Sequence, residues 1–266
     1  MARLSGKAGA VHLGLQTVHA CDAAWTTAGA GRVSTLDTTD YKVGSGAAKV
    51  VTTTIGGTTL LHTIDFAAIN LAAYVAILLW VKSSVNQSAG DCQLLLDDTS
   101  ACASPLESLD LPALTADVWK FCKLALANPG SDTAIISAGI KQITDLADMT
   151  FRCDAIEAAK TIAGIKSWTL DQEVEVLETT AFDSSGVRSF APTLTGWKGS
   201  FEGFKDGAPL TIGTVIGLEL RESATATQQF RGSAIITKLN PKVDISGLVT
   251  YAYEFQGIHG LEIASA

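Results

Sequence analysis

Residues 167–177 read Ser-Trp-Thr-Leu-Asp-Gln-Glu-Val-Glu-Val-Leu, and this stretch decides the class of fold. Glutamates and valines alternate from Glu173 to Val176, so in an extended chain the glutamates point to one side and the valines to the other. Period-two alternation is typical of a β-strand with one solvated face. We therefore predict a strand here and look for further strands on both sides of it.

Short apolar runs rich in Val, Ile and Thr recur along the whole chain, separated by turn residues such as the Gly-Gly pair at 56–57. These residue types favour strands, and short strands at regular spacing are typical of sandwiches and barrels. The sequence therefore predicts an all-β protein. We expect helix only as a turn at residues 67–71 and as one short helix at residues 208–213, and we expect a long loop at residues 179–195.

The composition is that of a globular protein with an acidic surface. Hydrophobic residues make up 47% and charged residues 17% of the 266 residues, and the formal net charge is −8. No Lys/Arg-rich run could form a cationic groove for nucleic acid. The longest apolar run, residues 69–81, is too short to span a bilayer, and no secretory signal is visible, so we expect folding in a cytoplasm.

The five cysteines divide the chain, because all of them lie between positions 21 and 153. No pair has the C-x-x-C spacing of a metal site. We expect buried free thiols, with one bridge, such as Cys92 to Cys102, as the alternative. The cysteine-containing stretch, residues 21–158, is interpreted as a module of its own, flanked by residues 1–20 and 159–266.

Catalytic motifs are missing from the sequence. It contains no HExxH, no phosphate-binding glycine loop and no Gly-x-Ser-x-Gly. No pair of carboxylates stands out as the acid and base of a glycosidase. We therefore expect a protein that is not an enzyme.

Four stretches of the flanking segments carry a family resemblance. They are Leu4-Ser-Gly-Lys-Ala-Gly-Ala-Val-His-Leu-Gly, Ile165-Lys-Ser-Trp-Thr-Leu, Gly196-Trp-Lys-Gly-Ser-Phe-Glu-Gly-Phe and Gly247-Leu-Val-Thr-Tyr-Ala-Tyr-Glu-Phe-Gln-Gly. Their succession resembles the major tail tube proteins of long-tailed, non-contractile phages. In that family the second stretch follows the first closely, whereas here about 140 residues separate them. The resemblance implies a tail-tube β-barrel from residues 1–20 and 159–266, with residues 21–158 inserted.

The resemblance also implies a function and a set of partners. Copies of the chain would form hexameric rings that stack into the hollow tube of a virion tail, together with other tail proteins. Genomic DNA would pass through the lumen without specific binding, and assembly would take place in the host cytoplasm. Glu173 and Glu175 would make the lumen acidic. The alternative is that these two residues belong to an ordinary solvated strand face.

The expected loop at residues 179–195 is assigned to contacts between rings. Phe182, Val187 and Phe190 are too apolar for a free loop, and Arg188 lies among them. Burial against a neighbouring ring would account for these side chains. The alternative is that they fold back onto the core of their own barrel.

The middle module resembles, more loosely, jelly-roll carbohydrate-binding domains. The matching stretches are Gly44-Ser-Gly-Ala-Ala-Lys-Val, Ile77-Leu-Leu-Trp-Val-Lys-Ser and Leu114-Thr-Ala-Asp-Val-Trp-Lys-Phe. The resemblance implies a β-jelly roll with a structural Ca²⁺ as its only cofactor, held by Asp22 and Asp154 near the two ends of the module.

A carbohydrate-binding or adhesion protein is the alternative function, with the flanking barrel as its support. Host-surface glycans would then be the ligands, bound through aromatic side chains such as Trp25, Tyr41 or Tyr74. These aromatic residues fit a protein core equally well.

Overall fold

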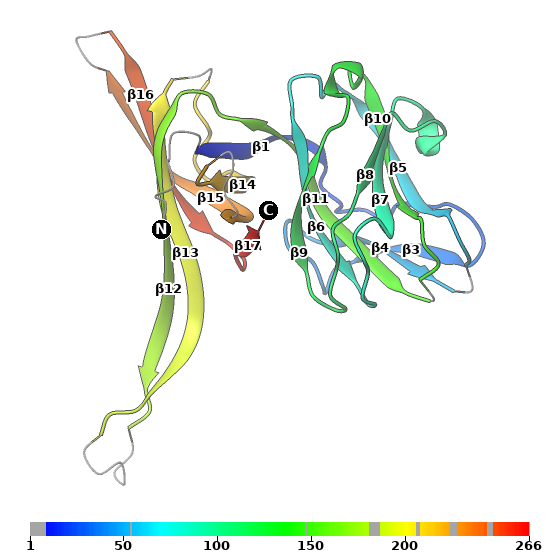
Figure 1. Ribbon diagram of the computed structural model, residues 1–266, viewed down its shortest axis with the longest axis horizontal. Coiled ribbons are helices and arrows are strands. Elements are labelled where there is room, and N and C mark those ends of the chain that lie inside the picture. Colours follow the sequence, from blue (N-terminus) through cyan, green and yellow to red (C-terminus); the bar gives the residue numbers. More distant parts are fainter. Residues whose placement is uncertain are drawn as a thin grey trace. The chain divides into compact units, whose positions relative to one another are not determined.

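The computed structural model describes residues 9–53, 55–146, 148–180, 187–205, 208–223, 228–243 and 247–265. The chain divides into two compact units (Figure 1). The first is made of two pieces, Met1–His12 and Ile162–Ala266, and we call it the split unit. The second is Leu13–Thr161, and we call it the continuous unit.

The all-β prediction is confirmed, since the described strands pair antiparallel into sheets. The described residues contain only two helical turns, each of three residues: η2 (Ser100–Cys102) and η3 (Pro129–Ser131). The short helix expected at 208–213 is wrong, because this segment forms a bend and a turn that ends at Gly213 with φ of +85°. The helical turn expected at 67–71 is also wrong, because strand β5 (Thr59–Ile69) continues through most of it.

The split unit is a single curved sheet. Its strands follow the order β12-β13-β16-β15-β14, with β1 beside β14 and β17 beside β15. Phe201 stacks on Tyr253 and Phe255, and these rings form the centre of its core. The bounds are β1 (Ala10–His19), β12 (Ile165–Glu178), β13 (Phe190–Phe204), β14 (Val215–Arg221), β15 (Gln228–Val243), β16 (Val249–Gly257) and β17 (Glu262–Ser265).

The continuous unit is a sandwich of two antiparallel sheets. One contains β3, β4, β11, β6 and β9, with the end of β1 beside β11, and the other has the order β2-β5-β10-β7-β8. Leucines, valines and Phe151 fill the space between the sheets. Besides β5, the bounds are β2 (Thr26–Thr27), β3 (Arg32–Asp37), β4 (Ala47–Thr52), β6 (Ala76–Ser83), β7 (Cys92–Asp97), β8 (Glu107–Asp110), β9 (Lys120–Ala125), β10 (Ile135–Gln142) and β11 (Thr150–Thr161).

The observed boundary between the units falls after His12, inside β1, whereas the sequence placed it after residue 20. A continuous strand offers no punctuation in the sequence, and the cysteine-containing stretch that defines the predicted module begins only at Cys21. The other boundary falls at residue 161, at the end of β11 and three residues from the predicted position. That the continuous unit is a jelly roll inserted into a tail-tube barrel stays a prediction.

All five cysteines are buried free thiols, so the alternative of a Cys92–Cys102 bridge is wrong. Burial raises the pKa of Cys92 to about 12 and that of Cys102 to about 11. Reactive thiolates are therefore not formed there at neutral pH. No helix among the described residues is long and apolar enough to cross a membrane.

Candidate assembly interface

The split unit carries a two-stranded ribbon that extends beyond its sheet (Figure 1). Strands β12 and β13 pair from Ile165 opposite Gly203 to Glu178 opposite Phe190. Strand β16 pairs only with the Lys198–Phe204 part of β13. Among the strands that the structure describes, none therefore lies as a third strand beside residues 171–178 and 190–197, and we call this ribbon the arm. An isolated two-stranded hairpin is only marginally stable in water, so the arm is a poor candidate for a free structure.

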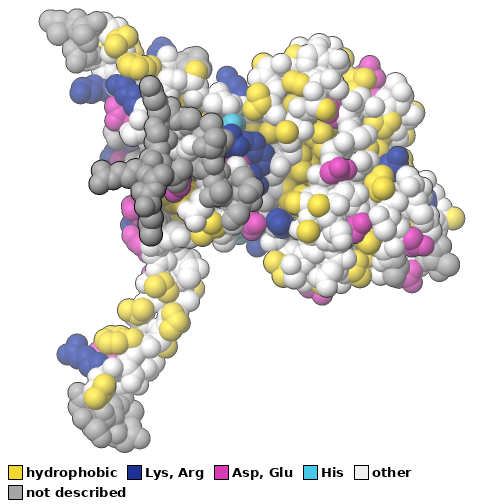
Figure 2. All heavy atoms as spheres, in the orientation of Figure 1, with side chains coloured by type: hydrophobic (Ala, Val, Ile, Leu, Met, Phe, Trp, Pro, Cys, Tyr) yellow, Lys and Arg dark blue, Asp and Glu magenta, His cyan; other side chains and the backbone are white. Residues whose placement is uncertain are grey.

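One face of the arm is exposed and mainly apolar, with Glu178 as its charged member. Val174 and Val176 share a face on β12, and Phe190 joins them because it lies opposite Glu178, two residues beyond Val176. Their exposed fractions are 51%, 59% and 56%. Leu194 on the same arm is also exposed, and so is Leu177, which lies on the opposite face with Glu175. Figure 2 shows hydrophobic side chains along the length of the arm. A contiguous apolar patch of this kind marks an interaction surface.

The opposite face of the arm is charged. Glu173 accepts a hydrogen bond from Lys198 at 2.6 Å, and Glu175 is exposed. The hydrogen bond to Glu173 raises the pKa of Lys198. The predicted strand is confirmed, and its period of two puts the two glutamates on the face away from the valines. The expectation of a single solvated face is wrong for this part of the strand, because residues 171–178 are exposed on both faces. Their assignment to a tube lumen stays a prediction.

The loop predicted at residues 179–195 is partly wrong. Residues 190–195 belong to β13, and Pro192 lies opposite Val176 in the ladder. Among the described strands, none pairs with the second edge of β13 near Pro192, so a missing N–H there breaks no hydrogen bond of the sheet. A register shift between Val174 and Val176 accommodates the proline in the ladder with β12. The loop is shorter than predicted because β13 already begins at Phe190 and continues through the proline.

The side chains assigned to ring contacts are exposed where the structure describes them. Phe182 lies outside the described residues. Val187 is 67% exposed, and Arg188 is exposed with its Nε 3.9 Å from Oε1 of Glu178. The alternative that these side chains fold back on the core is wrong for Val187 and Phe190. Both are available to a partner.

The sheet of the split unit also ends in an edge strand, β12. Strand β12 is the last in the sheet order, and only β13 pairs with it among the described strands. Its second edge therefore presents a row of N–H and C=O groups over fourteen residues. Such an edge is a template for pairing with another chain.

In the continuous unit, the two residues assigned to Ca²⁺ meet at one loop, residues 42–46. Asp154 Oδ2 accepts hydrogen bonds from the backbone N–H groups of Lys42 (2.6 Å) and Val43 (2.9 Å). Asp22 Oδ1 accepts from those of Ser45 (2.8 Å) and Gly46 (3.0 Å). The sequence placed these aspartates 132 residues apart, and the fold brings them together.

The donor set around Asp154 fits a cation in part. Oδ1 of Asp154 is buried and has no hydrogen-bond partner among the described residues. Burial raises the pKa of Asp154 to about 6, and the charge of Asp22 adds to the shift. A cation beside Oδ1 would relieve both effects. The described residues offer no group of three His, Cys, Asp or Glu side chains, so backbone oxygens would have to complete a Ca²⁺ shell.

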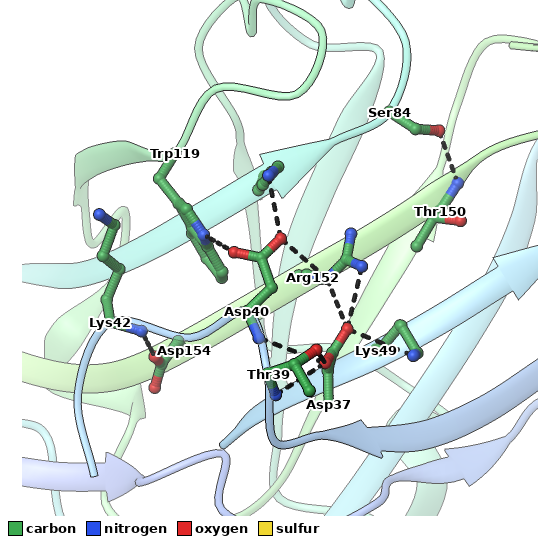
Figure 3. A network of polar contacts seen from close by, with 11 residues as sticks. Asp37, Thr39, Asp40, Lys42, Lys49, Ser84, Trp119, Thr150, Arg152 and Asp154 are labelled. Carbon is green, nitrogen blue, oxygen red and sulfur yellow. Dashed lines mark hydrogen bonds and ion pairs between the residues drawn. The ribbon is translucent and has the colours of Figure 1, made fainter. Parts of the chain in front are cut away.

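A charged network holds the segment that leads into this loop, around Asp37 and Asp40 (Figure 3). Arg152 bonds Oδ2 of Asp37 through Nη2 at 2.9 Å, and Lys49 lies 3.2 Å from the same oxygen. Asp40 accepts from Trp119 Nε1 at 2.6 Å. Burial alone would raise the pKa of Asp37, but hydrogen bonds from Thr39, Arg152 and Lys49 hold it well below its usual range. The network holds the 37–43 segment and so positions the Asp154 contacts.

The aromatic side chains proposed for glycan binding are mostly unavailable. Trp25 is buried in the core with its ring 4.6 Å from that of His62. Tyr74 packs against the same core. Tyr41 is 40% exposed, so it is the most accessible of the three, whereas Tyr74 is partly buried.

No protein-family model matches the sequence, and no curated protein matches it. Among solved structures, the chain is similar to one described as the tail of an empty GTA particle with C6 symmetry. The two share 17% identity with a TM-score of 0.35, over 41% of this chain and 87% of that chain. We therefore base the function on the geometry and sequence of this chain.

Proposed function

We propose that this chain is a non-enzymatic structural protein of a phage-type tail, which assembles with copies of itself through the split unit. The observation that carries the proposal is the exposed apolar face of the arm. The resemblance of the flanking segments to tail tube proteins supports it. The protein would then be part of the virion tail, in contact with other tail proteins. It would assemble in the host cytoplasm.

The arm and the open edge of β12 support assembly into rings and a tube. Covering the face of Val174, Val176 and Phe190 on a neighbouring copy would contribute about 25 cal/mol for each Å² removed from water. Pairing the open β12 edge with a neighbour would satisfy its backbone groups and continue the sheet around a ring, six copies being the number that the resemblance implies.

The charged face of the arm suits a conduit. Glu173 and Glu175 would line the lumen and repel the phosphates of passing DNA, so that it slides without specific binding. Lys198 neutralises part of this charge at Glu173. The continuous unit would decorate the outside of the tube, with Ca²⁺ at Asp22 and Asp154 as its one cofactor.

Negative-stain electron microscopy of the purified full-length chain tests the proposal. We expect rings or tubes of uniform bore at high protein concentration. A particle that stays monomeric at every concentration would contradict it.

The second candidate function is glycan binding by the continuous unit, which the exposed ring of Tyr41 favours. A glycan array separates the two candidates. Binding that disappears in Tyr41→Ala, in a protein that forms no assemblies, would favour the second.

A further inference from the structure

Glu107 and Asp132 are two buried acids whose side chains lie within hydrogen-bonding reach of each other inside the continuous unit. Neither the proposed assembly nor the proposed Ca²⁺ site uses them. Glu107 begins β8, and Asp132 follows η3 in the loop between β9 and β10. Both residues are essentially fully buried. Two ionised carboxylates in contact within a protein interior are strongly unfavourable.

The two carboxyl groups have different hydrogen-bond partners. The oxygens of Glu107 accept from the backbone N–H groups of Asn128 (2.6 Å) and Ala127 (3.0 Å). Neither side-chain oxygen of Asp132 has a donor among the described residues. N–H donors stabilise the charged form of a carboxyl group, and burial without donors favours the neutral form. Asp132 is therefore the member of the pair that favours its neutral, protonated form.

From this geometry we propose that Glu107 and Asp132 share one proton, held on Asp132 and donated to the Glu107 carboxylate, as a pH-sensitive clamp on the β9–β10 loop. The pair fastens this loop to β8 through Ala127 and Asn128. The backbone of Asp132 also accepts from Leu71 N–H at 2.7 Å, which ties the turn after β5 to the same place. The clamp therefore holds three segments together at one end of the sandwich: β8, the β9–β10 loop and the turn after β5.

Other charged groups on the surrounding strands face away from the pair. Glu107 lies opposite Leu96, which points into the core, so Glu107 points inward as well. Lys120, at the start of β9, bonds the carbonyl of Ala113 at 3.2 Å. The others alternate with core residues and lie on the outer face of their strands: Asp65 on β5, Asp97 on β7, Asp110 on β8, Lys123 on β9 and Lys141 on β10.

A cation between the two acids is the competing explanation. It would replace the proton and neutralise both carboxylates. The described residues place no third His, Cys, Asp or Glu ligand there. A shared proton needs no further ligand, so it accounts for the pair with the groups present.

The sign of the pH effect follows from the raised affinity of Asp132 for its proton. Burial raises the pKa of Asp132 to about 6, and the neighbouring Glu107 adds to the shift. Between about pH 3.8, the ordinary aspartate pKa, and about pH 6, the folded chain therefore keeps the proton on Asp132, whereas the unfolded chain releases it. The contribution of the pair is complete below that window and is lost as the pH rises through it, by up to about tenfold in the unfolding equilibrium for each pH unit.

The test compares the full-length chain with Asp132→Asn, which keeps the shape and a donor towards Glu107 but cannot ionise. Urea unfolding of the continuous unit is measured from pH 4 to pH 7. From pH 4 to pH 7, we expect the unfolding equilibrium constant of the wild type to rise by up to about 100-fold more than that of the variant. Asp154→Asn is the matched control, because Asp154 titrates in the same range; the effect of Asp132→Asn must persist in that background.

Carbon-detected NMR of the carboxyl groups gives a readout that does not depend on unfolding. We expect Asp132 to titrate near pH 6, and to titrate lower in Glu107→Gln, where the neighbouring anion is gone. Titration of Asp132 at an ordinary aspartate pKa overturns the proposal. An Asp132→Asn variant whose unfolding equilibrium depends on pH as steeply as that of the wild type also overturns it. So does a pH dependence of unfolding that, in the Asp154→Asn variant, is removed by Ca²⁺ and restored by EGTA.

Discussion

The continuous unit buries its large apolar side chains, whereas the split unit leaves many of its own exposed. Of the fifteen exposed large apolar residues described, eleven belong to the split unit and four to the continuous unit. Five of the eleven, namely Val174, Val176, Leu177, Phe190 and Leu194, lie on the arm. A closed sandwich has a core of its own, so its stability does not depend on neighbours. A ribbon with one apolar face needs a partner, so the unit that is less complete alone is the one we expect to assemble.

The largest expected effect concerns assembly. Val176→Asp with Phe190→Asp places two charges on the apolar face of the arm. Burying them against a neighbour would be strongly unfavourable, so we expect the apparent affinity between copies to fall by about 100-fold or more. Sedimentation velocity measures the loss of large species. Val33→Asp changes an equally exposed residue of the continuous unit and should leave assembly intact; equal losses in both variants would remove the distinction between the units.

The next effect concerns the core. Phe151→Ala empties a fully buried site of the continuous unit and should cost about 3–5 kcal/mol of its unfolding free energy. Phe190→Ala on the arm should change the unfolding free energy of the dissociated chain by less than about 0.5 kcal/mol. Urea titrations at low protein concentration measure both. Comparable losses would mean that the arm packs against its own unit.

The charged network of Figure 3 should make the continuous unit sensitive to acid. Asp37→Asn leaves Arg152 and Lys49 without their shared carboxylate and should cost about 2–3 kcal/mol at pH 7. The pKa of Asp37 is lowered in the folded chain, so its contribution is present above about pH 4 and is lost as the pH falls below that value. The difference between wild type and variant should therefore shrink at pH 3, whereas the exposed Asp98→Asn should show no difference at either pH.

The smallest expected effect is that of Ca²⁺. Binding at Asp22 and Asp154 should raise the melting temperature of the continuous unit by a few degrees, since a ligand of the folded state stabilises it. Differential scanning fluorimetry with Ca²⁺ or EGTA measures the shift. Asp154→Asn should abolish it, and Asp98→Asn should preserve it. An identical melting temperature with Ca²⁺ and with EGTA would contradict the site.

Local alternation was enough to predict the strand that begins the arm, because Glu173 to Val176 carry an unbroken period of two. It could not predict that β13 runs through Pro192, since the tolerance for proline depends on whether a strand is at an edge. The helix expected at 208–213 failed because Gly213 stops the segment in a turn.

Among the candidate site residues, Asp22 and Asp154 were predicted to meet, and the loop at residues 42–46 joins them. The Glu107–Asp132 pair was missed, because the two residues lie on different elements and no spacing signals their contact. Only the fold shows that Asp132 lacks donors. A buried acid leaves no mark in the sequence when its partner is distant.

The most direct test of the account is the accessibility of the apolar face in the assembled protein. Val176→Cys supplies an accessible thiol, because the five native cysteines are buried. We expect a maleimide to label it rapidly in dissociated chains and at least about tenfold more slowly in assemblies, whereas Val33→Cys should react at the same rate in both. Equal labelling of Val176→Cys in both states would contradict the claim that copies of this chain cover the arm.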